Sequence, residues 1–143
     1  MQTFVMKSFT DGELRRFRND DEGEKEAVKL ISEFFAAVQT VFSDAWVGRT
    51  PRTSRLVHGA GIIAMEFVME YLIMTENARK REEFAKGLSP LVGNVSWTEG
   101  FWDFGSNNVR PWNSLQVIAH DWLELGEFLI RILRREQREQ LQT

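Results

Sequence analysis

Three arginines stand close together at a turn that leads into a predicted helix. Arg49, Arg52 and Arg55 follow Gly48 and flank Pro51. Guanidinium groups bind carboxylates and phosphates in a forked geometry, and the free amides of a helix N-terminus add to the attraction for an anion. This turn is therefore a candidate anion-binding site. The alternative is a solvated basic loop that forms salt bridges with the acidic start of the preceding helix.

The segment 92–112 is a second candidate, because Trp97, Trp102 and Trp112 stand in it among Gly, Asn, Ser and Asp. Aromatic side chains are enriched both in ligand pockets and in protein interfaces. We expect this long loop either to line an aromatic pocket with an arginine at its mouth, or to fold back and fill the core. The first outcome would make the chain a small-molecule-binding domain.

The titratable residues form no recognisable catalytic set. The chain has no Cys and two His, His58 and His120. His120 adjoins Asp121, but neighbours on a helix point about 100° apart, so no dyad is expected. Glu66 and Glu70 lie one helical turn apart, yet neither histidine has the Glu-x-x-His spacing of di-iron bundles, and a polar stripe is expected instead. We predict no enzymatic activity, no metal and no cofactor.

Length and charge narrow the class of protein. The chain has 143 residues, 43% of them hydrophobic and 27% charged, with a formal net charge of −3. A single core usually takes about 100 to 200 residues, so one domain over residues 1–143 is expected. The acidic balance excludes a strongly basic nucleic-acid binder, and any binding to nucleic acid should be weak and salt-sensitive. Neither a signal peptide nor a membrane span is predicted, which favours the cytoplasm.

Hydrophobic spacing predicts a mainly helical chain. Apolar residues recur at intervals of three and four over residues 22–46 and again after Pro111, the pattern of amphipathic helices. Residues 55–77 are apolar around most of the circumference and predict a buried central helix. Short helices are expected near residues 10–19 and 79–86.

The predicted fold is an all-α, single-domain helical bundle with a long Trp-rich loop before the last helix. That helix should begin near Asn113, with Gln116 completing a capping box, and residues 134–143 should fray. Gly59 and Gly61 indicate either a close approach of another backbone, with the last helix as the expected neighbour, or a delayed helix start.

Three short segments carry a family resemblance: residues 34–46, the run SRLVHGAG at 54–61, and RPWNSLQ at 110–116. In this order they resemble the helical C-terminal part of DGQHR-domain proteins, a group that includes the DndB-like proteins of bacterial DNA-modification systems. The pentad that names the family is absent, since Asp11 and Gly12 precede Glu13, and no functional residue is carried over. The resemblance implies a helical module accessory to a DNA-modification or mobile-element system.

We therefore expect a non-enzymatic interaction module that works through oligomerisation or a partner protein. Helices whose apolar residues recur every three or four positions pack across a subunit boundary as readily as within one chain. A homodimer is therefore the expected state. The alternative is a small-molecule-binding domain with the aromatic pocket and the arginine-lined anion site. The last helix also carries several arginines near its C-terminus, where cations complement the helix dipole anyway: Arg131, Arg134, Arg135 and Arg138.

Overall fold

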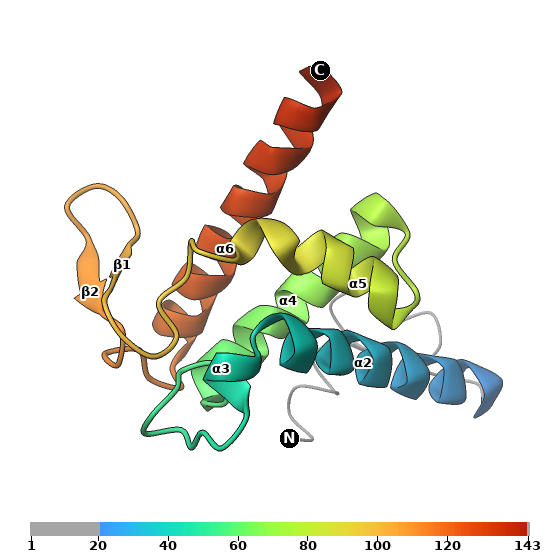
Figure 1. Cartoon of the computed structure of the whole chain (residues 1–143), viewed down its shortest axis with the longest axis horizontal. Coiled ribbons are helices and arrows are strands. Elements are labelled where there is room, and N and C mark those ends of the chain that lie inside the picture. Colours follow the sequence, from blue (N-terminus) through green and yellow to red (C-terminus); the bar gives the residue numbers. More distant parts are fainter. Residues whose placement is uncertain (1–20, 143) are drawn as a thin grey trace.

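The computed structural model describes residues 21–142, so the short helix expected near residues 10–19 lies outside the described part. The described chain is mostly helical, as the hydrophobic spacing predicts (Figure 1). In chain order its elements are α2 (Asp21–Val41), α3 (Ser43–Trp46), α4 (Gly59–Glu76), α5 (Arg81–Leu88), the 3-10 helix η2 (Ser89–Leu91), β1 (Phe101–Asp103), β2 (Val109–Pro111) and α6 (Ala119–Gln142).

The long helices pack in pairs, α2 against α5 and α4 against α6. In α2 the buried stripe runs through Ala27, Leu30 and Phe34, and the ring of Phe34 meets that of Phe84 in α5 edge-on, with centroids 5.3 Å apart. Val28 is 57% exposed, although it belongs to the three-four apolar spacing that predicts this helix. Figure 1 shows α2 running across the view while α6 rises steeply, and the predicted antiparallel bundle is not confirmed.

The helix predicted over residues 22–46 is interrupted at Phe42. Its backbone angles, φ −117° and ψ 45°, lie outside the helical region, and α3 begins at the next residue. The bend carries the ring of Phe42 toward Trp97, with the centroids 6.2 Å apart. The break in the helix thus coincides with the packing of Phe42 against the Trp-rich segment. The apolar spacing alone does not predict this break.

The central helix, α4, is buried along most of its length, as its apolar circumference predicts. It touches α6 through Phe67, which stacks on Trp122 with a centroid distance of 5.9 Å. Near its C-terminal end, the hydroxyl of Tyr71 donates to Oε1 of Gln137 at 2.5 Å, and Nε2 of Gln137 donates to Oγ1 of Thr75 at 3.1 Å. These bonds anchor the end of α6, which is helical through Gln142 although fraying was predicted from residue 134. None of the described helices is long and apolar enough to cross a membrane.

Both α4 and α6 begin after the first residue of the predicted helix, and at α4 this is the delayed start that Gly59 and Gly61 indicated as one alternative. At α4, Nδ1 of His58 accepts the amide of Ala60 at 3.1 Å, so the helix starts at Gly59 and not at Arg55. At α6, the chain from Asn113 onward stays irregular up to residue 118, and the helix starts at Ala119. The capping box predicted at Asn113 and Gln116 is therefore wrong, because the amide of Gln116 bonds to Asp121.

The described chain is not all-α, because the Trp-rich loop contains a β-hairpin. Strands β1 and β2 pair antiparallel, with Phe101 opposite Pro111 and Asp103 opposite Val109. Between them Gly105 has a φ of +87°, a left-handed conformation that favours glycine. The hairpin projects beside α6 in Figure 1. Periodicity could not reveal it, since each strand has only three residues.

Gly61 leaves no room for a side chain. A Cβ built on it would overlap the carbonyl oxygen of Arg55 and lie 3.0 Å from Cα of Leu56. The close approach predicted for this segment is confirmed, but the neighbouring backbone is the loop before α4 and not the last helix. At Gly59 the neighbour is the side chain of Val117.

Gly61→Ala should lower the free energy of unfolding by about 1–3 kcal/mol, because a backbone carbonyl cannot move aside as a flexible side chain can. The control is Gly126→Ala in α6, where the new Cβ would lie 3.4 Å from the ring of Phe67. Its gain in helix propensity, about 1 kcal/mol, should keep that variant at or above wild-type stability. Chemical denaturation compares the two, and equal stabilities would contradict this account of Gly61.

Candidate functional site

Arg55, one of the three predicted anion-binding residues, is 8% exposed and bonded within the fold. Its guanidinium donates to the carbonyl of Pro51 at 2.5 Å and to that of Asn113 at 2.6 Å. Its Cζ also lies 5.7 Å from the ring centroid of Trp112, a cation–π contact. Burial lowers the pKa of this guanidinium. Arg55 therefore joins the loop before α4 to the loop before α6.

The structure does not gather Arg49 and Arg52 around Arg55. Nε of Arg49 turns back to donate to the carbonyl of Asp44 at 2.9 Å. Arg52 is exposed, and its side chain has no hydrogen bond or ion pair with another residue between 21 and 142. The turn thus holds one arginine that bridges two loops and two that lie at the surface.

Two of the candidate tryptophans fill the core. Trp97 and Trp102 are buried and pack edge-to-face with centroids 5.1 Å apart, while Trp102 also meets Phe104 of the hairpin and Phe128 of α6. Trp112 is half-buried against Arg55. Of the two outcomes expected for the loop, this arrangement favours core filling and attaches the hairpin to α6.

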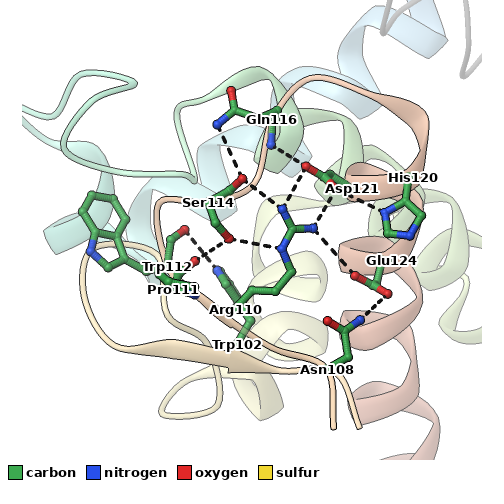
Figure 2. A network of polar contacts seen from close by, with 10 residues as sticks. All are labelled: Trp102, Asn108, Arg110, Pro111, Trp112, Ser114, Gln116, His120, Asp121 and Glu124. Atoms are coloured by element: carbon green, nitrogen blue, oxygen red, sulfur yellow. Dashed lines mark hydrogen bonds and ion pairs between the residues drawn. The ribbon is translucent and has the colours of Figure 1, made fainter. Parts of the chain in front are cut away.

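A polar cluster that the sequence did not reveal, here called the Arg110 network, holds the hairpin to the start of α6 (Figure 2). Arg110 of β2 donates to both carboxylate oxygens of Asp121, at 2.6 and 3.2 Å. The same guanidinium donates to the hydroxyl and the carbonyl oxygens of Ser114, at 3.2 and 3.0 Å. Asp121 in turn accepts the amide of Gln116 at 2.8 Å, so its carboxylate also ties the loop before α6 to the first turn of that helix.

The network extends to Asn108 and Glu124. Asn108 donates to Oε2 of Glu124 at 2.7 Å, and Oε1 of Glu124 lies 3.8 Å from the Arg110 guanidinium. A bidentate arginine–carboxylate pair of this kind is geometrically specific and nearly desolvated, since Asp121 is 3% exposed. The hydrogen bond from Arg110, helped by that from the amide of Gln116, lowers the pKa of Asp121 to about 2.

One prediction about this site was wrong. Nδ1 of His120 lies 3.2 Å from Oδ1 of Asp121, although adjacent helical residues were expected to point apart. The contact is possible because the two residues stand in the first turn of α6, where the Asp121 carboxylate folds back over the helix end (Figure 2). The nearby Ser114 hydroxyl is bonded to other groups: it donates to the carbonyl of Pro111 at 2.8 Å and accepts from Arg110.

Surface pockets border α6 in the described part of the chain. One, of about 260 Å³, lies among Glu76, Glu83, Lys86 and Glu136. Another, of about 550 Å³, lies between the hairpin and α6 and is named here the arginine groove; it is lined by Asn94, Asp103, Phe104, Phe128, Ile132, Arg131, Arg135 and Arg138 together with Gly105. Neither pocket is lined by Trp97, Trp102 or Trp112.

The comparisons with known proteins add no function. No protein-family model, curated protein or solved structure matches this chain. The resemblance to DGQHR-domain proteins therefore stays a prediction. Between residues 21 and 142 no three His, Asp or Glu side chains are grouped in a way that could hold a metal ion.

The Asp121 carboxylate should make stability depend on pH in the acid range. Its pKa is about 2 in the folded chain against an ordinary 3.8, so the stabilisation is fully present above about pH 4 and is lost as the pH falls through about 2. By linkage this amounts to about 2 kcal/mol. The difference in unfolding free energy between wild type and Asp121→Asn should shrink by that amount from about pH 5 to about pH 2. A difference that stays constant would contradict the assignment.

Arg55→Lys should destabilise the chain by about 1.5–3 kcal/mol, because one ammonium cannot reproduce two forked hydrogen bonds and the contact with Trp112. Arg52→Lys is the matched control at an exposed position and should stay within about 0.5 kcal/mol of wild type. Thermal melts of both variants make the comparison. Equal effects would mean that the bonds of Arg55 contribute nothing to stability.

Proposed function

We propose that this chain is a non-enzymatic interaction module that associates with a second copy of itself. The observation that carries the proposal is the apolar part of the outer face of the hairpin, Phe101, Val109 and Pro111, which we call the hairpin face. Asp103, the register partner of Val109, points to the same side. Phe101 is 66% and Val109 55% exposed, and Pro111 is exposed as well. Exposed aromatic and aliphatic side chains grouped on one face are typical of interaction surfaces.

The hairpin presents this face in a fixed position. Along β1 the residues alternate, so that Phe101 and Asp103 point outward while Trp102 is buried against the aromatic rings of α6. On the opposite strand Arg110 anchors the hairpin through Asp121. A rigid surface loses less conformational entropy on binding than a mobile loop does, which supports a role in association.

A second copy is the partner that this face fits. In a two-fold symmetric dimer the same patch meets itself, and apolar residues such as Phe101, Val109 and Pro111 are self-complementary in a way that charged ones are not. The side chains that a reaction would need are already bonded within the fold, with His58 capping α4 and Asp121 bonded to Arg110 and to the amide of Gln116. The resemblance to DGQHR-domain proteins suggests a DNA-modification or mobile-element system as the setting, accessory to other components.

Light scattering on the full chain after size exclusion should give about twice the monomer mass of 16.7 kDa at tens of micromolar. The double variant Phe101→Ser, Val109→Ser should be monomeric. Val28→Ser is the control, because Val28 lies on α2 and is exposed to nearly the same extent as Val109, 57% against 55%; it should leave the mass unchanged. A monomeric wild type would refute self-association, and a dimeric double variant would exclude the hairpin face.

A further inference from the structure

The arginine groove has an unbalanced positive charge. Arg131, Arg135 and Arg138 line it, and Asp103 is the carboxylate among its lining residues. Their spacing of four and three places the arginines on one face of α6, over a rise of about 10 Å. None of the three guanidinium groups has a hydrogen bond or ion pair to any residue in the part of the chain that the structure describes. Three cations therefore face one anion, on a chain whose net charge is −3.

Such an arrangement is unfavourable without a counter-ion. Like charges one helical turn apart repel each other, as Arg131 and Arg135 do here. A position at the C-terminal half of a helix favours cations in general, but Arg134 on another face of α6 would serve that purpose equally and does not line the groove. An anionic ligand along the groove would relieve the repulsion among its three arginines.

The remaining groups in the groove fit the rest of a ligand. Its volume of about 550 Å³ is far more than one phosphate needs and lies in the usual range for organic ligands, about 300–1,000 Å³. Phe128 and Ile132 give it an apolar wall. Across from them the hairpin side contributes Asp103, whose Oδ1 already accepts the amide of Gly105 at 3.0 Å and whose second oxygen can accept from a hydroxyl or amino group.

We infer that the arginine groove binds the phosphates of a nucleotide, with the three arginines on phosphate oxygens and the base or sugar against Phe128 and Ile132. Three arginines spaced over a helical rise of about 10 Å suit several linked phosphates better than a single one. The group that the groove recognises is a nucleotide unit. Such a unit is found in a free nucleoside triphosphate and in a single nucleic-acid strand, and the experiment separates these two ligands.

The test is fluorescence anisotropy with the full chain at about 50 mM salt, using a labelled fifteen-residue oligothymidylate in one arm and a fluorescent ATP analogue in the other. Binding of the strand, with weaker binding of the analogue, assigns the groove to single-stranded nucleic acid; the reverse order assigns it to free nucleotide. For the strand, three phosphate contacts predict that log K falls with log salt at a slope of about −2. Binding of neither probe up to about 100 µM overturns the inference.

The variants test the arginines themselves. Arg135→Gln should reduce the slope by about 0.7 for the strand, and the triple variant Arg131→Gln, Arg135→Gln, Arg138→Gln should weaken binding of the bound probe at least tenfold. Arg134→Gln removes the same charge from the same helix outside the groove and should change affinity less than twofold. Equal losses from Arg134→Gln and Arg135→Gln would show a diffuse charge effect and overturn the site. The hairpin-face variant Phe101→Ser, Val109→Ser should bind as wild type, so this result and the oligomeric state are independent.

Discussion

The contact between Arg110 and Asp121 is the constraint on which the functional surfaces depend. A three-residue pair of strands is too short to be stable alone, so the hairpin needs a partner in the rest of the fold. Trp102 supplies the apolar part of that attachment, and the buried arginine–carboxylate pair supplies the directional part. A buried pair of this kind is costly to break, because the remaining charge would be left without its partner.

The same contact also fixes where α6 begins. Asp121 accepts from Arg110 and from the amide of Gln116, and the helix starts two residues before it, at Ala119. One carboxylate therefore positions both sides of the arginine groove, the hairpin and the helix. Arg55 has a comparable role at the neighbouring loops, where it bridges Pro51 and Asn113. In both places an arginine connects segments that are distant in the sequence, Arg55 from a buried position and Arg110 from a half-buried one.

Much of the fold could be predicted from the sequence, and much of the site could not. The helical content and the buried α4 follow from apolar periodicity, which reports each helix by itself. The Arg110–Asp121 pair depends on which loop returns to which helix end, and no spacing along the chain contains that information. The helix predicted from Asn113 placed Asp121 in its third turn, so no role at the helix start was expected of that carboxylate. Arg110 was the available signal, because it is the one cation among the Trp-rich residues and needs an acceptor if it packs inward. Arg55 was predicted to bind a ligand because the sequence does not show which carbonyl groups lie near it in the fold. Its acceptors are the chain's own carbonyls, those of Pro51 and Asn113.

The central claim is that the Asp121 carboxylate holds the hairpin against α6. Hydrogen exchange measured residue by residue in wild type and Asp121→Asn tests it most directly. The amides of Phe104 and Trp112, which are bonded to Asn108 and Gly100 within the hairpin, should exchange much faster in the variant, while the amides of α4 keep their protection. Unchanged protection of the hairpin amides would contradict the claim, since the hairpin would then be held by its aromatic contacts alone.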